Sequence, residues 1–86
     1  MQQKVIALKY KKEEDIAPKV VAKGKGCIAD KIIKIAREHN IPIYEDKLLV
    51  ESLYKLELES YIPEELYEAV AKVLAFVYNL KKGNSA

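Results

Sequence analysis

Side chains that could perform chemistry are few and isolated in this 86-residue chain. His39 is the single histidine and ends a predicted helix, a position typical of a surface residue stabilised by the helix dipole. Cys27 is the single cysteine, and we interpret it as a small packed side chain in a protein of a reducing compartment. The acidic residues are scattered over loops and helix starts. We therefore predict no catalytic site, no metal site and no cofactor.

One glycine-containing segment could hold an anion. Gly24, Lys25 and Gly26 stand between a predicted strand and a predicted helix, where backbone N–H groups can surround a phosphate. The segment lacks the GxxxxGK(S/T) pattern, and Ala29 stands where a dinucleotide fingerprint has its third glycine. A structural turn is the favoured interpretation, and an anion contact is the alternative.

The elements that must position these residues form one small α/β domain. Half of the residues are hydrophobic and a third are charged, which is a globular composition, and 9.8 kDa leaves no room for a second domain. No apolar run approaches the roughly 20 residues of a bilayer-spanning helix, and no signal-peptide pattern opens the chain. We expect a cytoplasmic domain over residues 1–82, followed by a flexible tail over residues 83–86.

Hydrophobic periodicity predicts the individual elements. Strands are expected at residues 5–10, 19–23 and 41–44, and helices at about 27–40, 46–56 and 63–81. Asn40 is expected to end the first helix and Asp46 to cap the second. Because a helix joins the second and third strands, these should be parallel with a right-handed β-α-β crossover. The prediction is a three-stranded mixed sheet packed by three helices.

The last predicted helix, which begins at Pro63, carries more apolar surface than one face requires. One face would cover the sheet with Leu66, Val70, Val73, Val77 and Leu80. A second apolar row consists of Tyr67, Ala71, Leu74 and Tyr78. This row either packs between the sheet and a neighbouring helix or is partly exposed for a partner.

The net charge gives little indication of a partner. Fifteen Lys and Arg residues against thirteen Asp and Glu residues give +2, whereas a nucleic-acid-binding domain usually shows a basic face. Most of the basic residues alternate with acidic ones. A small nucleic-acid-binding domain is nevertheless an alternative, and it would use Lys9, Lys11, Lys12, Lys23 and Lys25.

Four ordered segments carry a resemblance to a known family. They are residues 5–10 (VIALKY), 17–24 (APKVVAKG), 35–43 (IAREHNIPI) and 62–67 (IPEELY). Together they resemble the C-terminal cytoplasmic domain of the FlhB/YscU family, the substrate-specificity switch of flagellar and injectisome type III secretion. The resemblance covers roughly residues 4–81.

The family cleaves itself at an Asn-Pro bond in an NPTH loop, where the Asn side-chain amide attacks its own main-chain carbonyl. In this sequence Met1, Gln2 and Gln3 stand where the family has Pro, Thr and His, and the Asn has no counterpart. The membrane domain of the family also has no counterpart within these 86 residues. We therefore expect a stand-alone domain without self-cleavage. Its first strand should have a free edge for the membrane-anchored part of a truncated FlhB, or for a second copy.

The resemblance also implies a hydrophobic patch that binds export substrates or a length-control protein. Carried over by position, the patch comprises Ala17, Pro18, Ala71 and Leu74, although four such residues could equally form the edge of the core. The favoured function is a non-catalytic protein-binding module of flagellar or type III export, a soluble counterpart of the FlhB cytoplasmic domain. The alternatives are the nucleic-acid-binding domain and a degenerate paralogue with little remaining role.

Overall fold

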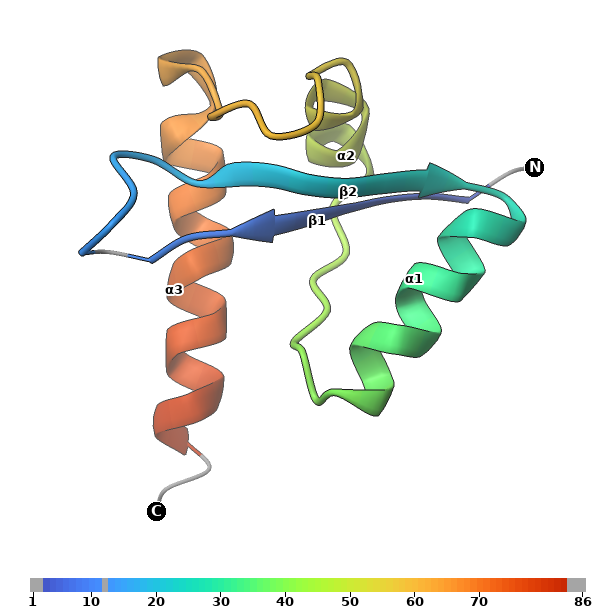
Figure 1. The fold of residues 1–86 in the computed structure, drawn as a ribbon. Helices are drawn as coiled ribbons and strands as arrows, with labels where there is room; N and C mark the ends of the chain where they lie inside the picture. The colour runs from blue at the N-terminus through green and yellow to red at the C-terminus, as the bar shows by residue number, and fades with distance from the viewer. Residues whose placement is uncertain (1–2, 12, 84–86) are drawn as a thin grey trace.

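An antiparallel pair of strands crosses the centre of the molecule (Figure 1). The computed structural model describes residues 3–11 and 13–83. The elements in this part of the chain are β1 (Lys4–Lys9), β2 (Lys19–Lys25), α1 (Cys27–Glu38), α2 (Lys47–Tyr54), the 3-10 turn η1 (Glu64–Leu66) and α3 (Tyr67–Gly83). The mixed α/β class with helices around a small sheet therefore agrees with the prediction.

The predicted third strand, residues 41–44, is wrong. This segment belongs to an extended connection from α1 to α2, and within the described residues no backbone hydrogen bond joins it to the sheet. The N–H of Ile41 instead donates to the carbonyl of Ala36 over 2.8 Å, and Pro42 has no N–H to donate. The described sheet therefore has two antiparallel strands, without the third strand, the parallel pair or the crossover that the sequence predicted.

The two outer edges of the sheet differ. On the β2 side, the N–H of Val20 donates to the Ser60 carbonyl over 3.0 Å, and the N–H of Ile62 donates to the Pro18 carbonyl over 2.9 Å. On the β1 side, no backbone partner lies among the described residues. The β2 edge is thus closed by the chain that leads into α3, while the β1 edge is open.

The main core lies where β1, α2 and α3 meet. Its buried members are Ala17, Leu49, Leu53, Ile62 and Val70. Ile6 and Leu8 of β1 pack against this cluster from the sheet. At a typical 25 cal/mol per Å² of buried apolar surface, such a compact cluster is the main stabilising contribution in a domain of this size. It also fixes α3 beside the end of the hairpin where the β1–β2 loop begins (Figure 1).

Helix α1 packs separately, against the other end of the hairpin (Figure 1). Ala29 is its fully buried residue, while Ile28 and Ile35 are 58% and 53% exposed. Gly24 of β2 makes this packing possible, because a Cβ atom there would collide with the Ile28 side chain. α1 thus rests on the sheet through small residues, Gly24 and Ala29.

The helix ends largely agree with the sequence. Asp46 caps α2 as predicted, since its carboxylate accepts a 3.1 Å hydrogen bond from the N–H of Leu49. Asn40 ends α1 in the left-handed region, with φ of 57°, and donates from its N–H to the Arg37 carbonyl. Pro63 differs from the prediction: it precedes η1 in an extended conformation. α3 continues to Gly83, and residues 84–86 of the predicted tail lie outside the described residues, as do Met1 and Gln2.

Candidate functional site

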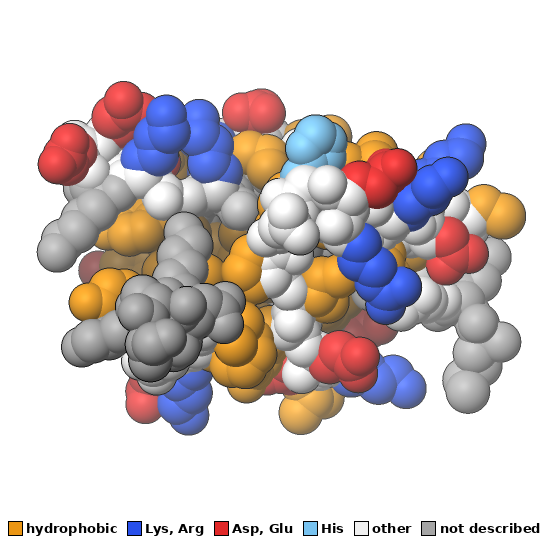
Figure 2. Space-filling model, turned by 90° about the horizontal axis from the view of Figure 1, so that it is seen from below, with side chains coloured by type: hydrophobic (Ala, Val, Ile, Leu, Met, Phe, Trp, Pro, Cys, Tyr) orange, Lys and Arg blue, Asp and Glu red, His pale blue; other side chains and the backbone are white. Residues whose placement is uncertain are grey.

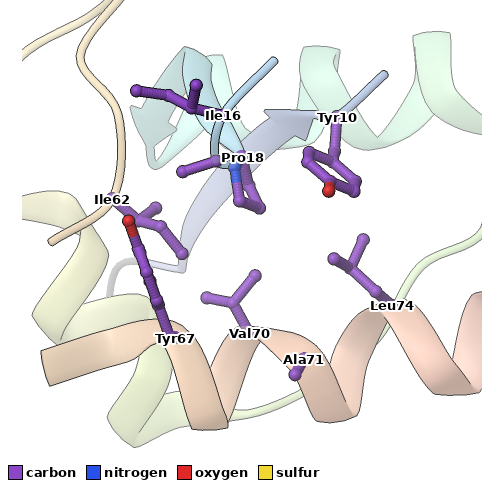
Figure 3. Close-up of a pocket in the computed structure, with 9 residues that line it drawn as sticks. Tyr10, Ile16, Pro18, Ile62, Tyr67, Val70, Ala71 and Leu74 are labelled. Atoms are coloured by element: carbon purple, nitrogen blue, oxygen red, sulfur yellow. The ribbon is translucent and has the colours of Figure 1, made fainter. Parts of the chain in front are cut away.

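An apolar groove lies between the β1–β2 loop and α3 (Figure 3). Its accessible volume is about 180 Å³. The lining residues are Tyr10, Ile16, Ala17, Pro18, Ile62, Tyr67, Val70, Ala71 and Leu74. All of them are hydrophobic or aromatic, so the groove offers contact to apolar side chains and few polar groups to orient a small molecule.

The loop wall of the groove is held by local hydrogen bonds. The Asp15 carboxylate accepts a 2.8 Å hydrogen bond from the backbone N–H of Lys11, and the N–H of Glu14 donates to the Lys11 carbonyl over 2.9 Å. This closes the turn that precedes Ile16, whose side chain is 85% exposed at the rim. Pro18 then enters β2, and both it and Ala17 are buried.

The helix wall is built from the second apolar row of α3. Val70 is fully buried beneath it, Ala71 is exposed and Leu74 is half-buried. Tyr67, one turn before Ala71, is 44% exposed and points its hydroxyl towards Ile62 (Figure 3). Tyr67, Ala71 and Leu74 of this row therefore line the groove, and Leu74 also packs against the core cluster.

The four residues assigned to the patch come together in this groove. Ala17 and Pro18 supply its loop side, and Ala71 and Leu74 supply its helix side (Figure 3). Segments more than fifty positions apart in sequence thus converge, because Ile62 and Val70 join the buried Ala17 in one core cluster. Their role in binding remains a prediction, but their shared location is a structural fact.

Sequence reasoning did not assign the other lining residues to the site. Tyr67 could have been assigned to the groove from the sequence, since it belongs to the second apolar row. Tyr10 and Ile16 had none, because only the turn between them brings their side chains to the same rim. Ile62 and Val70 could be read only as core residues, and the structure shows them as both core and groove floor.

The remaining chemistry of the described residues does not form a second site. No group of three or more His, Cys, Asp or Glu residues in residues 3–11 and 13–83 could hold a metal ion. Cys27 is exposed, not packed as predicted. Gly24 lies inside β2 and is buried against α1, so the predicted turn between strand and helix is confined to Gly26, whose φ is 61°.

The lysines of the nucleic-acid alternative do not form one surface. Lys9 and Lys25 lie at opposite ends of the β1–β2 ladder, where they pair with Lys19 and Lys4. Lys23 is half-buried and donates to backbone carbonyls, and Lys12 lies outside the described residues. On the face seen in Figure 2, basic and acidic side chains alternate around an apolar centre. Nothing in this arrangement resembles a basic binding face.

No helix in the described part of the chain combines the length and the apolar character that crossing a bilayer requires.

Comparisons with known proteins agree on one family. Residues 3–77 match the FlhB, HrpN, YscU and SpaS family. YlqH of Bacillus subtilis is 48% identical over 77 residues, a match that spans 90% of this chain and 83% of YlqH. The flagellar biosynthetic protein FlhB of Borreliella burgdorferi is 46% identical over 78 residues, but this chain spans only 21% of its length.

Solved structures show the same similarity. The crystal structure of the cytoplasmic domain of FlhB from Shewanella putrefaciens superposes with a TM-score of 0.91 at 40% identity, covering 95% of this chain and 64% of that one. A crystal structure of a mutated EscU C-terminal domain superposes with a TM-score of 0.86 at 36% identity, covering 90% and 94%.

Proposed function

The chain belongs to the FlhB, HrpN, YscU and SpaS family, and from this premise we propose that it is a non-catalytic protein-binding module of flagellar or type III protein export. It acts in the cytoplasm as a counterpart of the FlhB cytoplasmic domain and docks an export substrate or a length-control protein. The observation that carries this proposal is the convergence of Ala17, Pro18, Ala71 and Leu74 on one exposed apolar groove.

The groove suits a short apolar segment of a protein. Its 180 Å³ is enough for about one bulky side chain, whose burial is worth about 1.5–3 kcal/mol. An anchor of this size gives a weak contact with rapid dissociation. Weak docking fits a component that must receive successive export substrates and release each of them.

The open edge of β1 supports a second contact within the same function. Its backbone groups have no partner among the described residues, so an extended segment could add to the sheet there. The partner proposed for this edge is the membrane-anchored part of a truncated FlhB. Docking at the edge would place the groove at the export apparatus.

The experiment is genetic and uses a matched pair of variants. A strain whose FlhB ends directly after the Asn of its NPTH loop is supplied with this chain, and secretion of filament subunits is measured. Ala71 and Ala75 are both exposed on α3, but only Ala71 lines the groove. Ala71→Asp should abolish the rescue and Ala75→Asp should preserve it. Because the two changes cost the helix the same intrinsic propensity, a difference between them reports on the groove.

The outcomes separate the candidate functions. Equal loss with both variants, at equal protein levels, would contradict a role for the groove. Absence of rescue by the unchanged chain, together with absence of any bound flagellar protein, would favour the degenerate paralogue. Binding to nucleic acid that weakens steeply with increasing salt concentration would favour the nucleic-acid-binding domain.

A further inference from the structure

We propose that the partner segment in the groove carries a lysine or arginine beside its apolar anchor, and that Glu64 and Glu68 bind this cationic side chain. The inference rests on the proposed function, because it names the chemistry of the segment that the groove docks. Two observations carry it: the lining of the groove is apolar, and acidic residues of the sequence gather beside one of its ends. A cationic side chain next to an apolar one is complementary to both surfaces.

The groove has two distinct ends (Figure 3). Ile16 and Tyr67 lie at one end, and Tyr10 and Leu74 lie at the other. Both walls have acidic residues beside the first end. They are Glu13, Glu14 and Asp15, directly before Ile16, and Glu64, Glu65 and Glu68, around Tyr67. Since the whole chain carries +2, this local excess of acidic residues does not follow from the overall charge.

Helical geometry aligns two of these glutamates with lining residues. Glu64 stands three positions before Tyr67, and side chains three positions apart eclipse each other in the 3-10 geometry of η1. Glu68 stands three positions before Ala71, a spacing at which Cβ atoms on an α-helix are about 5–6 Å apart. Both glutamates are exposed, and neither belongs to an ion pair among the residues that the structure describes. Their carboxylates are therefore available to a cation at the Tyr67 end.

The basic residues near the groove do not cancel this charge. The Nζ atoms of Lys11 and Lys19 each lie 3.7 Å from a glutamate carboxylate oxygen. Leu8 packs against the core cluster, so Lys9, its neighbour in β1, lies on the opposite face of the strand. Lys72 follows Ala71 in α3 but does not line the groove. The Tyr67 end therefore keeps an excess of negative charge.

Acidic residues in the first turn of a helix also stabilise its dipole. A role limited to the dipole would change the stability of the domain, but it would not change which ligand the domain prefers. Ligand charge is therefore the variable that separates the two roles.

Titration of the full chain with three synthetic peptides measures this preference. The peptides have equal length and one central leucine, which is flanked by lysines, by glutamates or by serines. NMR resonances of Val70, Ala71 and Leu74 report binding in the groove. At low ionic strength we expect the lysine peptide to bind about three- to tenfold more tightly than the glutamate peptide, because exposed ion pairs are individually weak. Added salt should reduce this ratio. Non-specific attraction to a chain of charge +2 would give the opposite order.

A matched pair of double variants locates the charge. Glu64→Gln with Glu68→Gln should abolish the preference for the lysine peptide. Glu38→Gln with Glu45→Gln changes the net charge equally at exposed positions outside the groove, and should retain the preference. A dispersed NMR spectrum confirms that each variant is folded. Equal affinities for the three peptides, equal loss in both double variants, or no shift of groove resonances up to about 10 mM peptide would overturn the inference.

The export assay keeps this inference separate from the proposed function. We expect Glu64→Gln with Glu68→Gln to lower the rescue of secretion several-fold. Full rescue by this double variant, with loss of rescue by Ala71→Asp, would overturn the inference and leave the proposed function standing. A lysine-peptide preference in a chain that rescues no export would support the inference and contradict the proposed function.

Discussion

Lys23 of β2 and Tyr54 of α2 interact through both the ring and the backbone. The Nζ of Lys23 lies 5.3 Å from the centre of the Tyr54 ring and donates a 3.1 Å hydrogen bond to the Tyr54 carbonyl oxygen. It also donates to the Leu56 carbonyl over 2.8 Å. Carbonyls at the end of a helix have no partner within the helix, so Lys23 satisfies the C-terminal end of α2 from the sheet.

Replacing this lysine should destabilise the domain. Lys23→Met keeps the aliphatic part of the side chain but removes the charged donor, and hydrogen bonds that involve a charged group are worth about 1.5–3 kcal/mol. Urea denaturation should show a lower midpoint at an unchanged slope. Lys25→Met is the control, because Lys25 is exposed at the end of β2. Equal midpoints for both variants would contradict the capping role.

Gly24→Ala should also destabilise the domain, for a steric reason. The added methyl group would overlap the Ile28 side chain, and overpacking of this kind costs about 1–3 kcal/mol. The double variant Gly24→Ala, Ile28→Ala should lose less stability than the sum of the two single changes. Additive effects in this double-mutant cycle, measured by denaturation, would show that the two residues do not compete for the same space.

Hydrogen exchange should distinguish the observed sheet from a three-stranded one. The amides of Val20 and Ile62 donate to backbone carbonyls at the closed edge of β2, whereas the Ile43 amide has no backbone partner among the described residues. We expect slow exchange at Val20 and Ile62 and fast exchange at Ile43. Comparable protection at Ile43 would mean that residues 41–44 pair as a strand in solution.

The contact between Tyr44 and Phe76 should anchor this connection to α3. Their ring centres lie 5.1 Å apart in an edge-on arrangement. Such pairs contribute about 0.5–1.5 kcal/mol beyond the area they bury. A double-mutant cycle with Tyr44→Ala and Phe76→Ala should therefore give a coupling energy in this range. A coupling near zero would indicate that the connection is not held by this pair.

Local patterns were sufficient to predict most of the elements. Asp46 and Asn40 act at the helix ends where their side-chain and backbone chemistry is favourable. The apolar alternation of residues 5–10 and 19–23 corresponds to β1 and β2, with ends shifted by one or two residues. In each case the determinant lies within a few positions of the residue it places.

The failed prediction depended on a distant partner. Residues 41–44 are apolar and contain Pro42, which is compatible with an edge strand, but a strand also needs a neighbour with matching free groups. The Ile41 amide is instead used to close the end of α1, and the Tyr44 ring packs against α3. Composition within a short segment cannot show which of these contacts is made.

The site was predictable in part for a different reason. Ala17, Pro18, Ala71 and Leu74 came from positions shared with a family, and the surplus apolar row pointed independently to the last two. The rim residues Tyr10 and Ile16 depend on how the Lys11–Asp15 turn folds back, which no periodicity encodes. The loop side of a groove is therefore harder to foresee than its helix side.

The two walls of the groove come from opposite ends of the sequence, residues 10–18 and 62–74. A ligand seated between them clamps an early segment of the chain to a late one and cannot remain bound once either has come away. A bound ligand would therefore stabilise the whole domain against heat and denaturant, and this stabilisation would increase with ligand concentration by mass action. Melting curves alone could then screen candidate ligands without any label or assay of export.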